Sequence, residues 1–233
     1  MSQHSDHLAR QDRNLTLAVI QALQMWSNVS YRHFLHGDRG SITDDWFRWF
    51  VGEWNVARTI QNGRREMVRR YMNDDFRRAV SNGNGAESVD AAALHIKTSN
   101  WSAKLGKTKQ PSLPISLVSK IGFFLRPSDL VPLDRYSLLG LNMLRASADT
   151  PPLNKPSYQQ YLGAFNQQYD TMKPQIAAVL KESWVAPLAG KLGCPDRALT
   201  TAALPRKVLD NYLMHSGGYL TGQSRDATVS ASS

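Results

Sequence analysis

The sequence has little of what marks membrane, secreted or disulfide-linked proteins. One cysteine, Cys194, stands among 233 residues, which excludes an internal disulfide and suits a reducing compartment. No apolar run approaches the ~18 residues that cross a bilayer. The first residues lack the basic and apolar regions of a secretory signal. We therefore expect a cytoplasmic protein with no membrane partner.

Motifs for cofactors and metals are missing as well. The six histidines and the single cysteine show none of the spacings that hold zinc. No glycine-rich loop is placed to cradle phosphate, and no Ser-His-Asp set can be identified. We therefore expect no metal and no cofactor.

Positive charge, in contrast, is plentiful. The chain carries 28 Lys and Arg against 19 Asp and Glu, a formal net charge of +9, and its pI is about 9.8. Such a balance favours an anionic partner, with nucleic acid first and a membrane surface second. The alternative is that the charge only keeps the protein soluble. Hydrophobic residues at 42% indicate a globular chain.

Apolar residues recur at helical spacing through most of the chain, and no alternating strand series or internal repeat is found. The sequence therefore predicts an all-α fold of many helices in two lobes with a cleft between them. The segment Ser81–Gly85 is the clearest linker. It separates an N-terminal helical region, 1–81, from a second domain, 86–215. The Gly/Ser-rich tail, 216–233, is expected to be disordered.

The helices are expected over 14–36, 44–54, 64–78, 88–101, 115–125, 135–145, 158–172, 176–184 and 206–215. The helix over 115–125 is apolar on most sides, and Ser116, Ser119 and Lys120 share its narrow polar sector, into which only Phe123 intrudes. A lysine that emerges from such a helix into a cleft is partly desolvated, which favours a neutral, nucleophilic amine.

Asp134 follows fourteen residues after Lys120, at the start of the next helix. A carboxylate there accepts backbone N–H groups, faces the positive helix end and stays ionised. An amine beside a fixed carboxylate suits attack at the C1′ carbon of a deoxyribose. The carboxylate would stabilise the sugar cation while the lysine forms a Schiff base.

This segment resembles the active-site region of helix-hairpin-helix DNA glycosylases, especially bacterial 8-oxoguanine-glycosylase-like proteins. In that family an L-P-G-V-G-x-K hairpin carries the lysine, and a V-P-V-D-like turn carries the aspartate. Here Leu113-Pro114 and Ser119-Lys120 match the hairpin ends, and Val131-Pro132-Leu133-Asp134 matches the turn. The resemblance implies Lys120 as nucleophile and Asp134 as catalytic carboxylate. It covers closely only residues 113–141.

The segment departs from the family in two ways. Both hairpin glycines are replaced, and the interval from lysine to aspartate is shorter. Without the glycines the backbone cannot approach a phosphate closely, so DNA must be held by other groups. The candidates are three lysines and three arginines: Lys104, Lys107, Lys109, Arg64, Arg65 and Arg69. A solvated helix face on which the arginines pair with acidic neighbours is the alternative.

Aromatic residues offer candidates for stacking on an extruded base, which a base-excision enzyme requires. They are Trp46, Trp49 and Phe123. The structural alternative is that the tryptophans fill the core. Lys120 has a structural alternative too, a buried stem with its amine in water, and Asp134 has that of a simple helix N-cap.

These patterns predict a monomeric DNA glycosylase, with or without β-lyase activity, that removes a modified base in base-excision repair or in defence against phage DNA. The rival prediction is a non-catalytic DNA-binding protein that retains a glycosylase-like fold. A helical interaction protein with another partner is the third possibility.

Overall fold

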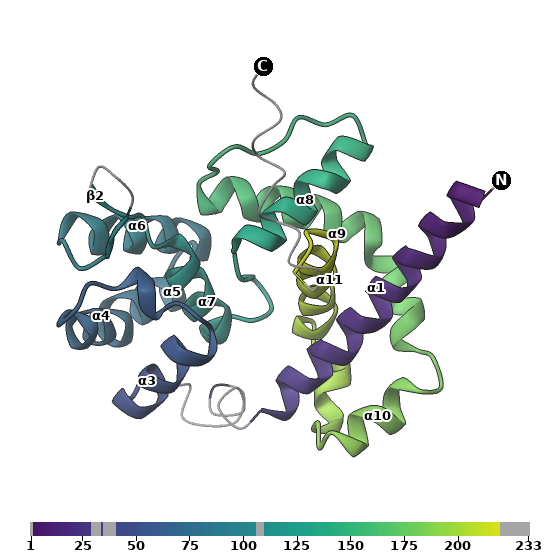
Figure 1. Cartoon of the computed structure of the whole chain (residues 1–233). Coiled ribbons are helices and arrows are strands. Elements are labelled where there is room, and N and C mark those ends of the chain that lie inside the picture. Colours follow the sequence, from purple (N-terminus) through teal and green to yellow (C-terminus); the bar gives the residue numbers. More distant parts are fainter. Residues whose placement is uncertain (1, 29–33, 35–40, 106–109, 220–233) are drawn as a thin grey trace. The chain divides into compact units, whose positions relative to one another are not determined.

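The computed structural model describes residues 2–28, 34, 41–105 and 110–219, without the side chains of 2–12, 105, 196 and 197. The described chain is mainly helical (Figure 1), which confirms the all-α prediction. It also holds one small sheet, which the sequence did not predict. Strands β1 (Lys104–Leu105) and β2 (Gln110–Pro111) pair antiparallel, with Lys104 opposite Pro111.

The chain forms two compact units. Unit 1 comprises residues 1–28, 134–156 and 163–233, and unit 2 comprises 29–133 and 157–162. These units divide the chain elsewhere than at the expected linker, Ser81–Gly85. That segment is a tight turn within unit 2, where the Asn84 side chain accepts a hydrogen bond from Ala86 N and caps the next helix.

Unit 2 is built from short helices in close succession. They are α3 (Asp44–Glu53), the 3₁₀ turn η1 (Ala57–Thr59), α4 (Arg65–Tyr71), the π turn η2 (Met72–Phe76), α5 (Arg77–Asn82), α6 (Gly85–Thr98) and α7 (Ile115–Leu125). Helices α4, η2 and α5 form one continuous helical run, which packs on α6.

The π turn follows from the spacing of the apolar residues. The buried side chains of the run lie four residues apart, at Val68, Met72, Phe76 and Val80. Two α-helical turns hold about 7.2 residues, so a spacing of eight drifts around a regular helix. A π turn, closed by i→i+5 hydrogen bonds, adds about one residue. All four side chains therefore stay on one face, against the core.

The core of unit 2 is aromatic around α7. The Phe124 ring lies 5.3 Å from Trp46, 5.9 Å from Phe50 and 5.2 Å from Trp54, between ring centroids, and all three pairs are edge-to-face. This geometry is the favourable one for aromatic rings. The α3 helix that supplies these partners begins at Asp44, where the hydroxyl of Thr43 accepts from Trp46 N.

A distant piece of chain completes this core. The hydroxyl of Tyr158 donates to the Val131 carbonyl and accepts from Val131 N, and that of Tyr161 donates to the Pro132 carbonyl. The Asp90 carboxylate caps the same segment by accepting from Tyr158 N at 2.7 Å. Residues 157–162 are thus an integral part of unit 2, although more than twenty residues separate them from its other segment.

Unit 1 is organised around its last helix. It contains α1 (Ser2–Ser27), α8 (Arg135–Ser147), most of α9 (Tyr158–Leu180), α10 (Val185–Lys191), the 3₁₀ turn η3 (Asp196–Thr200) and α11 (Ala203–Ser216). Helix α11 packs against both α1 and α8. Most of its residues are buried, including the ion-paired Lys207 and Asp210 and the imidazole of His215.

Helices α8 and α11 touch backbone to backbone. A Cβ atom added at Gly140 would lie 2.0 Å from the Leu213 carbonyl oxygen, and one added at Gly217 would lie 2.1 Å from the Tyr136 carbonyl oxygen. Only a residue without a side chain fits at these crossings. The two glycines therefore determine how closely the helices approach.

Candidate nucleic-acid interface

Lys120, the predicted nucleophile, lies on α7 with 9% of its surface exposed. Its Nζ donates to the Trp54 carbonyl oxygen at 3.3 Å and lies 5.8 Å from the centre of the Trp54 ring. The carbonyl is a hydrogen-bond acceptor for the amine, and the ring is a cation–π partner. These are the surroundings of a lysine that ties α7 to the end of α3.

Asp134, the predicted catalytic carboxylate, is the N-cap of α8. Its Oδ1 accepts from Tyr136 N and Ser137 N, both at 2.9 Å, and the Ser137 hydroxyl in turn accepts from Asp134 N. This reciprocal pair is a capping box. Asp134 is therefore a helix N-cap, which was the structural alternative to a catalytic role. Lys120 belongs to unit 2, and Asp134 begins a segment of unit 1.

Arg69, a predicted DNA contact, is engaged within the protein. It forms two hydrogen bonds to Glu66, at 2.8 and 2.7 Å, and a third to the Ile42 carbonyl at 3.0 Å. The hydrogen bonds from Arg69, and then from Arg70, lower the pKa of Glu66 from 4.5 to about 2. Arg69 therefore fixes the segment before α3 to the helical run and is poorly placed to bind a phosphate.

The other predicted DNA contacts differ in their surroundings. Arg64 is half-buried and donates to the Met67 sulfur at 3.4 Å. Arg65 and Lys104 are exposed. Lys107 and Lys109 lie outside the described residues.

The three predicted stacking residues lie in or beside the aromatic core. Phe123 is fully buried, and Trp46 is 6% exposed and stacked 4.9 Å from Phe50. Trp49 is half-buried, with its ring 6.2 Å from that of Trp46. In this arrangement Phe123 and Trp46 present no ring face to a base.

A different group of residues gathers where two loops meet. Ile60 and Ser102 form an antiparallel bridge, Ala103 N donates to the Thr59 carbonyl at 2.9 Å, and Gln61 N donates to the Trp101 carbonyl at 2.8 Å. Ser112 N donates to the Ala103 carbonyl at 3.0 Å. The segments 59–61, 101–105 and 110–112 therefore lie side by side, an arrangement that we call the loop junction.

Four exposed cations flank this junction. Arg58 directly precedes Thr59, and Lys104 directly follows Ala103. Lys97 lies in the last turn of α6, four residues before Trp101, and Arg65 starts α4 four residues after Gln61. Across the part of the chain that the structure describes, none of the four forms an ion pair or a side-chain hydrogen bond. We call Arg58, Arg65, Lys97 and Lys104 the junction cations.

Three aromatic side chains, those of Tyr71, His95 and Trp101, pack together beside the loop junction. His95 stacks on Tyr71 with centroids 4.3 Å apart, and its ring lies 5.2 Å from that of Trp101. Burial, with a contribution from the Asp75 carboxylate, raises the pKa of Tyr71. His95 is exposed and Trp101 half-exposed. An aromatic group among exposed cations has the composition of surfaces that bind nucleic acids.

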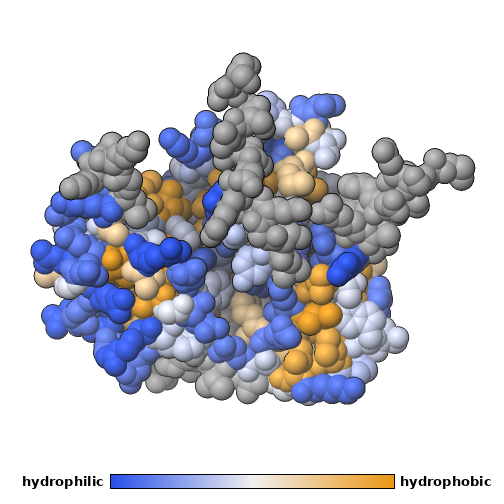
Figure 2. Space-filling view, viewed as in Figure 1, coloured by the Kyte–Doolittle hydropathy of each residue, from blue (hydrophilic) through white to orange (hydrophobic). Residues whose placement is uncertain are grey.

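Sequence reasoning missed most of this group, because its members lie far apart in the chain. Arg58 and Lys97 are single cations without a motif, and Tyr71, His95 and Trp101 come together only through the packing of α4 on α6 and the loop junction. The signal for this site in the sequence was the excess of positive charge in unit 2. Residues 29–133 and 157–162 hold sixteen Lys and Arg against ten Asp and Glu. Figure 2 shows hydrophilic side chains over much of the face around α4 and α6.

The described residues offer neither a metal site nor a membrane span. No group of three or more His, Cys, Asp and Glu side chains is placed to hold an ion within the described ranges. None of the described helices is both long and apolar enough to cross a bilayer.

Comparisons with protein families, with curated proteins and with solved structures find no match for the chain. Function is therefore inferred from the residues themselves.

Proposed function

We propose that this protein binds DNA through the loop junction of unit 2, with the junction cations on the phosphates. The observation that carries the proposal is the set of four exposed cations that form no ion pair with any residue the structure describes. A surface arginine or lysine that already has a carboxylate partner, such as Arg48 with Asp44, must give up that partner to bind a phosphate. The junction cations give up only water and counterions.

The aromatic group adds a second source of affinity. Stacking of a base on an aromatic ring contributes about 1–3 kcal/mol in single-stranded complexes. The exposed His95 and the half-exposed Trp101 offer such surfaces beside the cations. We therefore expect DNA with unpaired bases at an end or a gap to bind more tightly than an intact duplex.

The test is the salt dependence of DNA binding, measured by fluorescence anisotropy with a labelled duplex. Each phosphate contact contributes about 0.9 to the slope of log K against log salt. Arg58→Ala and Lys104→Ala should each weaken binding and reduce the slope by about one. Arg48→Ala removes the same charge from an exposed, paired arginine and is the matched control. If all three variants lost the same DNA affinity, binding would depend on net charge alone and the proposal would be refuted.

Excision of a base by Lys120 and Asp134 remains a separate prediction. Borohydride should trap a covalent adduct with abasic DNA if Lys120 is a nucleophile, and Lys120→Ala should abolish the adduct. A glycosylase that activates water would release base without an adduct, and Asp134→Asn would then be the inactivating change. The partners observed for both side chains are those of structural residues, so the DNA-binding proposal does not depend on them.

A further inference from the structure

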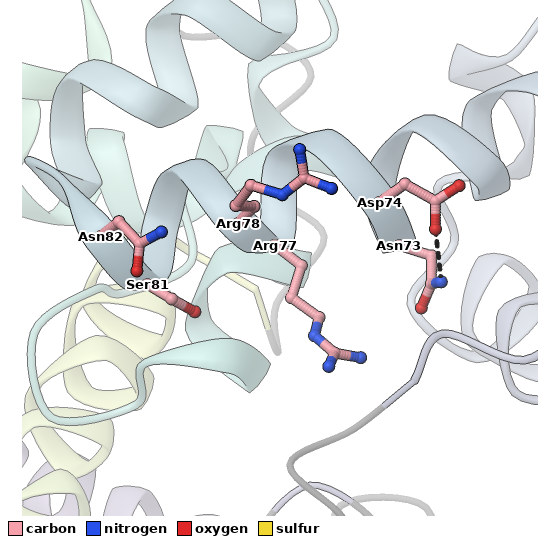
Figure 3. Close-up of a pocket in the computed structure, with 6 residues that line it drawn as sticks. All are labelled: Asn73, Asp74, Arg77, Arg78, Ser81 and Asn82. Atoms are coloured by element: carbon pink, nitrogen blue, oxygen red, sulfur yellow. Dashed lines mark hydrogen bonds between the residues drawn. The ribbon is translucent and has the colours of Figure 1, made fainter.

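The helical run from α4 to α5 carries a second polar feature. A surface hollow of about 370 Å³ is lined by six residues of this run, none of them apolar (Figure 3): Asn73, Asp74, Arg77, Arg78, Ser81 and Asn82. The hollow shares no residue with the loop junction. We propose that it binds a phosphorylated ligand, with Arg77 and Arg78 as the charged contacts.

The π turn helps to align the residues that line the hollow. The lining residues occupy two neighbouring rows along the helix, one through Asn73, Arg77 and Ser81 and the other through Asp74, Arg78 and Asn82. In each row the spacing is four residues, the same as that of the buried row of Val68, Met72, Phe76 and Val80. The extra residue of the π turn keeps all these rows parallel to the helix axis. In a regular α-helix each step of four residues would turn these rows by about 40° around the axis.

The side chains of the hollow supply hydrogen-bond donors of several kinds. Two guanidinium groups carry the positive charge, and their planar forks fit phosphate oxygens; Figure 3 shows both with the other side chains that line the hollow. The side chains of Arg78, Ser81 and Asn82 form no hydrogen bond with any of the described residues. Their donors are therefore available to a ligand.

The hollow also contains one opposing charge and one fixed side chain. Asn73 Oδ1 accepts from Ile42 N at 2.7 Å, and Asn73 Nδ2 donates to Asp74 Oδ1 at 2.8 Å. Asp74 is held to one side in this way, but its carboxylate still repels an anion. The two arginines outweigh it, and the lining carries a formal charge of +1.

The carbonyl end of α5 would by itself disfavour an anion. Arg126 offsets it, since its guanidinium donates to the Val80 carbonyl at 2.9 Å and to the Gly83 carbonyl at 3.2 Å. The Val80 and Gly83 carbonyls thus already have a donor within the protein, and Arg126 in turn pairs with Asp129.

Titration calorimetry with inorganic pyrophosphate tests the proposal on the full chain. The wild type should bind, Arg78→Ala should bind at least about tenfold more weakly, and Arg78→Lys should fall between them because a lysine lacks the fork. Asp74→Asn should bind more tightly than the wild type. Arg48→Ala, which removes an exposed arginine of α3 outside both the hollow and the junction cations, should bind like the wild type. Circular dichroism verifies that each variant is folded.

A second arm distinguishes the sources of phosphate. If a short DNA duplex displaces pyrophosphate and loses affinity in Arg78→Ala, the ligand is a nucleic-acid backbone. If the duplex binds equally well to wild type and Arg78→Ala while pyrophosphate does not, the ligand is a small phosphorylated molecule. Both results support the hollow as a phosphate site. It is refuted if wild-type protein fails to bind pyrophosphate, or if Arg48→Ala weakens binding as much as Arg78→Ala does. Neither outcome depends on the junction cations.

Discussion

Gly140 is the position where a single methyl group should disturb unit 1 most. An added Cβ would lie 2.0 Å from the Leu213 carbonyl oxygen and 2.7 Å from its carbonyl carbon. Both atoms belong to the backbone of α11, so the overlap cannot be relieved by a side-chain rotation. The α8 and α11 helices would have to separate by more than about 1 Å, since nonbonded carbon atoms prefer about 3.5–4.0 Å.

We expect Gly140→Ala to lower the free energy of unfolding by about 2 kcal/mol. Overpacking costs about 1–3 kcal/mol or more, and a backbone overlap belongs at the upper end. The helix propensity of alanine returns up to about 1 kcal/mol. For a chain of this length the loss corresponds to a melting temperature lower by about 4–8 °C. Urea and thermal denaturation followed by far-UV circular dichroism measure both quantities.

The control is Gly163→Ala on α9, where an added Cβ would meet no atom within 4 Å. There the propensity gain stands alone, so this variant should be more stable than the wild type by up to about 1 kcal/mol. If Gly140→Ala matched Gly163→Ala, the close crossing of α8 and α11 would be refuted.

Three further predictions concern other residues. Burial lowers the pKa of His215, so the unfolded chain takes up a proton at higher pH than the folded chain does. The free energy of unfolding should therefore fall as the pH drops below about 6.5. Denaturation at several pH values measures this dependence, and a His215→Leu variant in which the free energy of unfolding depends on pH as in the wild type would contradict the prediction. Phe124→Ala should lower the free energy of unfolding by about 3–5 kcal/mol, and Phe124→Leu should lower it much less. Urea unfolding measures both values, and small, similar decreases in the two variants would argue against the aromatic core. Glu66 should titrate near pH 2 in carboxyl NMR spectra rather than near 4.5. Glu66→Gln should strengthen DNA binding by releasing Arg69 and Arg70, and unchanged affinity would show that these two arginines play no part.

The sequence predicted the helical class because its apolar residues follow a helical period over most segments. It did not predict the π turn, although Val68, Met72, Phe76 and Val80 contain the signal, an apolar spacing of four that a regular helix cannot hold on one face. The sequence also predicted a helix break near Pro174, but α9 continues through this residue. The local cost of an interior proline is outweighed there by the burial of Met172 and Ile176.

The candidate sites were harder to predict because their partners are distant in the chain. The polar sector of α7 was identified, but the carbonyl that binds Lys120 belongs to Trp54, 66 residues away. Asp134 could be understood locally, since a helix N-cap depends on residues within one turn. The loop junction depends on a bridge between Ile60 and Ser102, for which no short-range pattern exists.

The tyrosine hydrogen bonds of unit 2 also constrain the order of events during synthesis. Tyr158 and Tyr161 are fully buried in a unit whose other residues end at Leu133. A nascent chain that has just released residue 133 therefore lacks two of its largest core side chains and leaves Val131 and Pro132 without their hydroxyl partners. The ribosome must add roughly thirty more residues before this core can close, which at about 5–20 residues per second leaves apolar surface open to chaperones for a few seconds.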